Sequence, residues 1–242
     1  MRLDIELVKR KLVVSRSKAY YLVKEKYVRV NGVIVDKPSR CVEKKDILSI
    51  DFNPNLWVSR GGIKLDSLFK SLNIKRLKGI GLDIGSSKGG FTEVLLKYGV
   101  EKVYSIDVGK NQMDKNLKKN KKVFLFEGLN VKDMKQNIFP KFDIIVCDVS
   151  FISLKKFLTI PLEFTHIDTK LFLLIKPQFE LDKKINLKNG ILKDEEIHHE
   201  VCQNAKNFLK KLYWEVSDIK KCEIKGTDGN QEYFIIASKL NL

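Results

Sequence analysis

Residues 82–91 read LDIGSSKGGF, which predicts a β-strand that ends in a glycine-rich turn and leads into a helix. Gly85, Gly89 and Gly90 fall in the turn, where glycine permits positive φ angles and lets the backbone approach a ligand closely. A dinucleotide fingerprint would read G-x-G-x-x-G, whereas the spacing here is G-x-x-x-G-G. Asp83, just before the turn, would repel a pyrophosphate but attract a sulfonium or an α-amino group. The stretch therefore favours S-adenosylmethionine over NAD as ligand.

Short apolar segments alternate with amphipathic segments on both sides of this turn. The expected strands are residues 79–84, 102–107, 123–126, 142–148, 171–176, 214–219 and 232–238. The expected helices are residues 90–98, 111–119 and 194–212. This rhythm predicts an α/β fold in which a Rossmann-like parallel sheet carries helices on both faces. The last two strands read as a hairpin-like pair.

A second acid supports the same cofactor. Asp107 ends the second strand, 22 residues after Gly85, where a carboxylate can accept both hydroxyls of a ribose. Asn130 and Val131 follow the third strand and are candidate neighbours of the adenine, although an ordinary loop explains them equally well. The residues expected to bind S-adenosylmethionine are Ser59, Arg60, Asp83, Gly85, Ser86, Ser87, Gly89, Gly90, Phe91, Asp107, Val108, Asn130, Val131 and Asp148.

Four charged residues are expected at the same sheet edge or at its entrance. Lys64 lies in SRGGIKL, Asp148 ends the fourth strand, Lys176 ends the fifth, and Glu232 begins the last. Singly, each would more often be a solvated or ion-paired side chain; together they suit methylation of a ribose 2′-hydroxyl. That hydroxyl is a poor acid and needs a base or strong electrostatic help. A lysine could serve, because burial and a neighbouring cation depress its pKa.

The N-terminal 50 residues are distinctly basic. They hold 13 basic and 6 acidic side chains, and five of the chain's seven arginines, within a protein of net charge +16. Lysine-rich drift would not concentrate arginine there, and arginine forks bind phosphate in a bidentate manner. Two short helices, a hairpin turning at Asn31-Gly32, and a last short strand are expected. The candidate RNA-binding residues are Arg2, Arg10, Arg16, Lys18, Arg29 and Arg40.

The N-terminal pattern resembles the S4 RNA-binding domain. The matching text is RLD…L, SRSKAYYLV, VRVNGVIVDKPS and V..KDILSI. The resemblance implies an RNA clamp without chemistry of its own. We expect an S4-like domain over residues 1–50, a linker over 51–58 and a second domain over 59–242.

Across nearly the whole chain the sequence resembles the TlyA-type (hemolysin A) family, an S4 domain fused to an FtsJ-like methyltransferase. The motifs are VSRGGIKL, LDIGSSKGGF, VYSIDVG, CDVSFISL, LIKPQFE, GILKDEEIHH and IKGTDGNQEYF. The family implies a seven-stranded class I methyltransferase sheet and S-adenosylmethionine-dependent 2′-O-methylation of ribosomal RNA, on cytidine in assembled subunits. Its K-D-K-E tetrad carries over to Lys64, Asp148, Lys176 and Glu232. Lys88 departs from the small residue usual in the glycine turn, where a cation suits a sulfonium poorly unless it points to solvent or RNA, so we expect Lys88→Thr to leave or improve cofactor binding.

Several other classes are disfavoured. No apolar run approaches the roughly 20 residues that span a bilayer, and the four cysteines form no CxxC pair. We therefore expect a cytoplasmic protein with no metal and no membrane partner. The family resemblance implies that it acts on ribosomal RNA or ribosomal subunits, and we expect a monomer or weak oligomer. The alternatives are an RNA-binding ribosome assembly factor with a vestigial site, a membrane-active haemolysin and an NAD-dependent enzyme.

Overall fold

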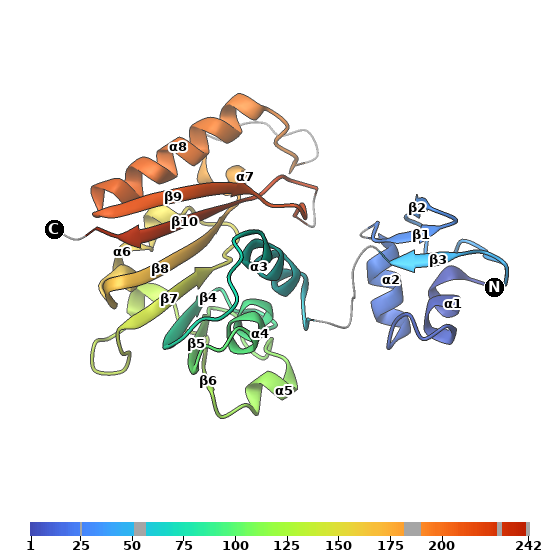
Figure 1. The fold of residues 1–242 in the computed structure, drawn as a ribbon, viewed down its shortest axis with the longest axis horizontal. Helices are drawn as coiled ribbons and strands as arrows, with labels where there is room; N and C mark the ends of the chain where they lie inside the picture. Colours follow the sequence, from blue (N-terminus) through green and yellow to red (C-terminus); the bar gives the residue numbers. More distant parts are fainter. Residues whose placement is uncertain (25, 51–56, 182–189, 227–228, 241–242) are drawn as a thin grey trace. The chain divides into compact units, whose positions relative to one another are not determined.

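The computed structural model describes residues 1–24, 26–50, 57–181, 190–226 and 229–240. The chain forms two compact units, Met1–Trp57 and Val58–Leu242, which are described separately (Figure 1). Most of the expected linker, residues 51–56, lies outside the described residues.

The N-terminal unit packs two helices against a small antiparallel sheet. Its elements are α1 (Leu3–Lys9), α2 (Arg16–Lys24), β1 (Val28–Val30), β2 (Val33–Val35) and β3 (Leu48–Ile50). The strand order is β2-β1-β3, and the β1–β2 hairpin turns at Asn31-Gly32, as expected. Asn31 and Gly32 both have positive φ (52° and 79°), which a tight hairpin turn requires. Leu3, Leu7 and Leu22 are fully buried in its core.

The larger unit contains the remaining elements. Its strands are β4 (Ile80–Ile84), β5 (Lys102–Asp107), β6 (Val123–Glu127), β7 (Phe142–Cys147), β8 (Thr165–Ile175), β9 (Trp214–Lys221) and β10 (Tyr233–Lys239). Its α-helices are α3 (Arg60–Ser71), α4 (Gly90–Lys97), α5 (Lys115–Lys118), α6 (Thr159–Leu162), α7 (Pro177–Glu180) and α8 (Glu195–Lys211). Two 3₁₀ turns, η1 (Val131–Asp133) and η2 (Leu154–Lys156), complete it.

The seven strands form one sheet in the order β6-β5-β4-β7-β8-β10-β9. Strands β4 to β8 pair in parallel, whereas β10 pairs antiparallel with both β8 and β9. The expected Rossmann-like sheet with a C-terminal hairpin is therefore confirmed. Because Tyr233 at the start of β10 pairs with Ile175 at the end of β8, the reversed strand brings its amino end to the carboxyl edge of the parallel strands.

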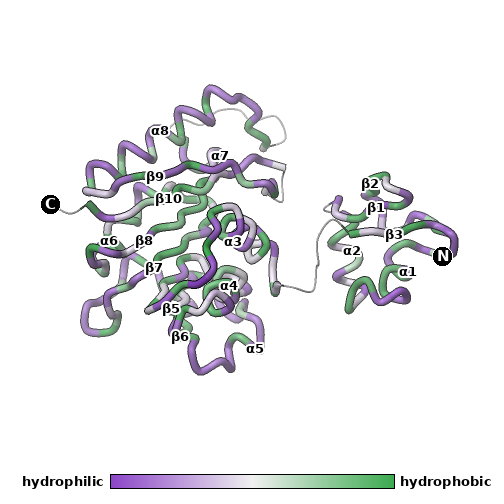
Figure 2. The backbone as a smooth tube through the Cα atoms, in the orientation of Figure 1, coloured by the Kyte–Doolittle hydropathy of each residue, from purple (hydrophilic) through white to green (hydrophobic). Residues whose placement is uncertain are grey.

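Helices cover both faces of this sheet, as predicted. On one face, Phe172 of β8 meets Phe69 of α3 with ring centroids 5.0 Å apart, and Phe234 of β10 stacks on Phe91 of α4. On the other face, the core joins α8 to β8 and β10, for example through Leu209. Figure 2 shows hydrophobic central strands and a helix α8 with alternating hydrophilic and hydrophobic stretches. Within the described part of the chain, no helix is long and apolar enough to cross a membrane.

Helices α3, α6 and α7 were not among the expected elements, and two expected elements differ in extent. The helix expected over residues 111–119 is only one turn, α5, because Asn111 has a left-handed backbone (φ 58°) and Asp114 caps the helix start through Asn116 N. Strand β8 begins at Thr165 rather than at residue 171, since its first residues already pair with Phe142 at the start of β7.

Candidate active site

The glycine turn after β4 is tightly packed against its neighbours. Gly85 has a φ of 79°, and a Cβ there would lie 2.5 Å from the carbonyl oxygen of Asp148. A Cβ on Gly90 would lie 2.1 Å from Ser59 Oγ, at the start of α3. Glycine is therefore required at both positions, and it brings the starts of α3 and α4 and the end of β7 together around one turn.

Asp83 is completely buried beneath this turn. Its Oδ2 accepts a hydrogen bond from Thr92 Oγ1 at 2.6 Å, while its Oδ1 has no partner among the described residues. Burial, together with the charges of Asp148 and Asp107, raises the pKa of Asp83 to about 7, although Thr92 opposes this shift. Ser86 Oγ, in the turn itself, is likewise buried and without a partner in the described chain. Two orphaned acceptors at a glycine turn fit a ligand with a cationic amine.

Asp107, at the end of β5, is oriented by the backbone around it. Its Oδ2 accepts from Ser87 N and its Oδ1 from Gly109 N, both at 2.7 Å. A carboxylate has about four lone-pair sites, so the group can still accept two ribose hydroxyls. Val108 is 70% exposed beside it, which leaves an apolar surface next to the proposed ribose position. Lys88 is exposed.

Three of the expected cofactor residues have structural roles in their side chains. Phe91 is buried and stacks on Phe234, and Val131 is buried in the main core, so neither side chain presents a free surface to a ligand. Asn130 Oδ1 accepts from Lys132 N and caps η1. The packing of these three side chains therefore does not favour direct contacts between them and the cofactor. At the start of α3, Arg60 Nη2 donates to the carbonyl of Lys225.

The four expected catalytic residues form two ion pairs at the carboxyl edge of the sheet. Lys64 is carried on α3, and its Nζ donates to Glu232 Oε2 at 2.5 Å, with both side chains buried. Lys176 Nζ lies 2.7 Å from Asp148 Oδ1, with both groups only partly exposed. Asp148 and Lys176 directly follow the neighbouring strands β7 and β8, whereas Glu232 directly precedes β10. The topology of the sheet therefore explains how these four residues, which are far apart in the chain, come to lie at one edge.

The expectation of a lysine with a depressed pKa is wrong for Lys176 in this state. Burial does lower the pKa of Lys176, but the charge and hydrogen bonding of Asp148 and the charge of Glu232 outweigh it. The pKa of Lys176 is therefore raised above its usual value. The expectation rested on burial and a neighbouring cation; burial acts in the expected direction, but the near neighbour of each lysine in the set is an acid.

Two further residues of the site, Ser150 and Phe151, lie in the loop that follows Asp148 and were not expected from the sequence. Ser150 Oγ accepts from Lys176 Nζ at 2.7 Å. Phe151 is 88% exposed, has a φ of 67°, and lies 4.8 Å from the ring of Phe179. Such strain in a bulky residue is typical of functional loops. The available signal was position alone, since both follow Asp148 in CDVSF.

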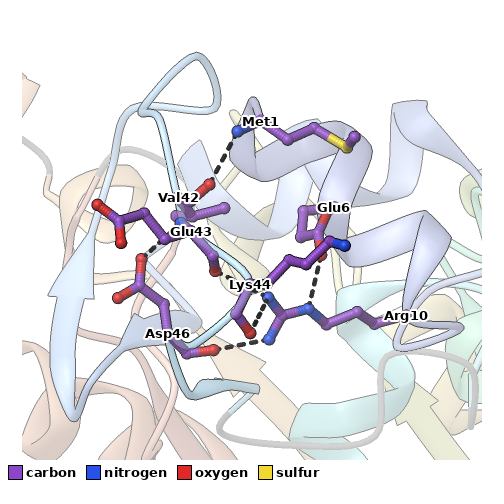
Figure 3. Close-up of polar contacts among 7 residues, drawn as sticks. All are labelled: Met1, Glu6, Arg10, Val42, Glu43, Lys44 and Asp46. Carbon is purple, nitrogen blue, oxygen red and sulfur yellow. Dashed lines mark hydrogen bonds and ion pairs between the residues drawn. The ribbon is translucent and has the colours of Figure 1, made fainter.

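The six basic residues expected to bind RNA do not share one environment. Arg10 donates from Nε to Glu6, from Nη1 to the carbonyl of Asp46, and from Nη2 to the carbonyls of Glu43 and Lys44 (Figure 3). All three guanidinium nitrogens therefore bind the protein itself. Arg10 ties α1 to the segment before β3, and an RNA-phosphate role for it is not favoured.

Arg2 and Arg16 share one buried carboxylate. Both Nε atoms lie 3.0 Å from Asp4, while the arginine side chains remain 44% and 60% exposed. Arg29 Nη1 donates to the carbonyl of Gly32 in the hairpin turn. Asp4 therefore holds two guanidinium groups side by side at the surface.

The strand order, the glycine turn with its buried acid, and the two lysine–carboxylate pairs together define a Rossmann-like methyltransferase fold. Comparison with known sequences agrees: the profile of the FtsJ-like methyltransferase family matches residues 57–239, and that of the S4 domain matches residues 1–48. The chain belongs to the FtsJ-like methyltransferase family and carries an N-terminal S4 domain.

Similar proteins match this chain over nearly its whole length. The chain is 34% identical to the 23S rRNA (cytidine-2′-O)-methyltransferase TlyA of Campylobacter jejuni, covering 97% of this chain and 98% of that protein. It is 36% identical to Hemolysin A of Brachyspira hyodysenteriae, over 96% and 98% of the two chains. A solved structure from Streptococcus thermophilus superposes with a TM-score of 0.77 at 30% identity, covering 100% of this chain and 89% of that one.

Proposed function

We propose that this protein transfers a methyl group from S-adenosylmethionine to the 2′-hydroxyl of a ribose in ribosomal RNA. The observation that carries the proposal is the pairing of Lys176 with Asp148 beside the glycine turn, with the Lys64–Glu232 pair at the same sheet edge. The Campylobacter relative, which is named as acting on cytidine in 23S rRNA, supports cytidine as the target nucleoside. A similar Mycobacterium tuberculosis protein is named for both 16S and 23S rRNA.

Asp83, Ser86 and Asp107 are the side chains best suited to hold the cofactor. The unpartnered Asp83 Oδ1 and Ser86 Oγ offer acceptors for the amine end, and Asp107 offers acceptors for the ribose. Gly85 and Gly90 would let the backbone close around it. When bound, the cofactor supplies an activated methyl group on a positively charged sulfur.

Lys176 is placed to accept the proton of the ribose hydroxyl as the oxygen–methyl bond forms. Its Nζ must first lose a proton, and the raised pKa means that only a small neutral fraction is present near pH 7. Asp148 holds the amine in place and stabilises it again once it is protonated. Lys64 and Glu232 form a buried ion pair at the same sheet edge, and the charge of Glu232 adds to that of Asp148 in stabilising the protonated Lys176 amine.

The N-terminal unit is the proposed RNA clamp. Arg2, Arg16, Lys18, Arg29 and Arg40 are the basic side chains assigned to phosphate contacts, and Arg10 is assigned to the fold instead. We take residues 1–50 as the RNA-binding domain, 51–58 as the linker and 59–242 as the methyltransferase domain. A ribosomal RNA substrate would place the reaction in the cytoplasm, with a monomer or weak oligomer sufficient for it.

The test is transfer of labelled methyl from S-adenosylmethionine to ribosomal subunits isolated from cells lacking the protein. Wild type is compared with Lys176→Ala and with Ser217→Ala, whose hydroxyl donates to the Ile236 carbonyl within the β9–β10 strand pair. We expect label in the ribose of a cytidine with wild type and Ser217→Ala, and none with Lys176→Ala. Tight subunit binding without label would instead indicate an assembly factor.

A further inference from the structure

The loop after Asp148 brings a hydroxyl to the amine of Lys176. Lys176 Nζ donates to Ser150 Oγ at 2.7 Å and lies at the same distance from Asp148 Oδ1. An ammonium group has three N–H bonds and can rotate about its own Cε–Nζ axis. The hydroxyl fixes one N–H direction and the carboxylate attracts another, so one tetrahedral direction of the nitrogen remains.

We propose that Ser150 is a positioning residue that orients the amine of Lys176 toward the ribose hydroxyl, an inference that rests on the proposed function. A neutral amine keeps two N–H donors and one lone pair. Ser150 accepts a hydrogen bond from one N–H, and the Asp148 carboxylate, in ion-pair contact at 2.7 Å, attracts the second. The lone pair then occupies the remaining direction and can accept the proton from the 2′-hydroxyl. Without Ser150, rotation about the Cε–Nζ bond spreads the lone pair over several directions.

The loop that carries the hydroxyl is hydrogen-bonded to the helix that follows the amine. Glu180, at the end of the short helix that follows Lys176, accepts from Ser153 Oγ at 2.6 Å and from Leu154 N at 3.0 Å. These bonds tie the loop that carries Ser150 to the helix that begins directly after Lys176. The separation between Oγ and Nζ is thus set within one local structure.

The contact is suited to chemistry more than to stability. Ser150 is exposed, so loss of its hydroxyl leaves no buried cavity, and the Lys176 side chain is 11% exposed. The charged or titratable groups that act on the Lys176 amine are Asp148 after β7, Glu232 before β10 and the buried thiol of Cys147. Ser150 is the neutral acceptor in this set, and it can direct the amine without adding charge.

The experiment compares Ser150→Ala, Ser150→Thr and Ser217→Ala with wild type in methyl transfer to ribosomal subunits. For Ser150→Ala we expect kcat to fall about tenfold, which corresponds to one hydrogen bond to a charged group. The KM for subunits, the Kd for S-adenosylmethionine and the Tm should stay unchanged. Loss of an acceptor for the ammonium also lowers the pKa of the base, so the rise of kcat with pH should move to lower pH. Ser150→Thr should restore kcat, because it keeps the hydroxyl.

Each outcome has one meaning. An active wild type with unchanged kcat and pH profile in Ser150→Ala would overturn the inference and leave the proposed function intact. A loss of kcat in Ser150→Ala that is accompanied by a lower Tm and a higher KM for subunits would also overturn it, because the serine would then have a structural role. An inactive wild type would refute the proposed function itself.

Discussion

Lys64 and Glu232 are separated by 168 residues in the chain, yet Lys64 Nζ and Glu232 Oε2 lie 2.5 Å apart and both side chains are buried. The pair joins helix α3, which precedes the sheet, to the residue before its last central strand. It therefore links the two ends of the catalytic unit directly at the proposed reaction site.

Breaking this pair should destabilise the larger unit and stop methylation. Glu232→Leu leaves Lys64 buried without its partner, which costs about 3–5 kcal/mol. The double variant Lys64→Met/Glu232→Leu should recover most of that stability, because two apolar groups need no partner, and remain inactive. Denaturant unfolding followed by Trp214 fluorescence in a Trp57→Phe background measures stability. An active double variant would show that the pair serves only the fold.

Methyl transfer should become faster with rising pH. The pKa of Lys176 is raised by Asp148 and Glu232, so its neutral form increases about tenfold per pH unit in the range below that pKa. Single-turnover rates between pH 6 and 9 measure this dependence. Asp148→Asn removes the charge that does most to raise the pKa of Lys176. In this variant the rate should rise at lower pH than in wild type and reach a lower maximum. A flat wild-type profile would argue against Lys176 as the base.

Cofactor affinity should depend on the ionisation of Asp83. Its pKa is raised to about 7 by burial, so the folded apoprotein binds a proton that the unfolded chain releases near its usual value of 3.8. This contribution to stability is present at low pH and is lost as pH rises through 7. A cationic ligand prefers the ionised form, so calorimetry should show Kd for S-adenosylmethionine falling up to about tenfold per unit as pH rises toward 7. Asp83→Asn should abolish the dependence, whereas a persisting slope would assign it elsewhere.

Phe151 should contribute to RNA substrate recognition. An exposed aromatic ring at the mouth of the site can stack on a base that has left its helix, a contact worth about 1–3 kcal/mol. Phe151→Ala should therefore weaken kcat/KM for subunits by roughly 5–150-fold, and Phe151→Trp should retain activity. Phe151→Gly relieves the positive φ, so it should raise Tm while losing the same activity. Equal activity in wild type and Phe151→Ala would exclude stacking.

Arg10 and Arg16 should have opposite roles although both lie in the basic N-terminal unit. Arg10→Ala removes three hydrogen bonds that join the end of α1 to the segment before β3, and a fourth to Glu6 within α1, so it should lower the stability of that unit. Arg16→Ala should leave the fold intact and reduce the salt dependence of RNA binding by about one counterion. Circular dichroism melts and binding titrations at several salt concentrations separate the two effects. If Arg10→Ala kept its full stability but reduced the salt dependence of RNA binding, Arg10 would have to be assigned to RNA contacts instead of the fold.

Much of the fold could be predicted, because its signals are local. The alternation of apolar and amphipathic segments and the Asn31-Gly32 turn indicated strands, helices and the hairpin that the structure contains. The helix expected over residues 111–119 was wrong in length, since the left-handed backbone of Asn111 depends on neighbours that sequence periodicity does not report. Arg10 was expected to bind RNA because it lies in the basic N-terminal region. Its hydrogen bonds to backbone carbonyls some 35 residues away could not be predicted from the sequence.

By itself, the sequence determined the succession of the seven strands of the larger unit, the glycine turn after β4, and the four charged residues of the tetrad. These are properties of consecutive residues and of motif spacing. Only the tertiary structure decided that Lys64 pairs with Glu232 and Lys176 with Asp148, that Ser150 contacts the Lys176 amine, and that the pKa of Lys176 is raised. Those features depend on distances between segments remote in the chain and on the exclusion of water as they pack, which change the energy of each charge.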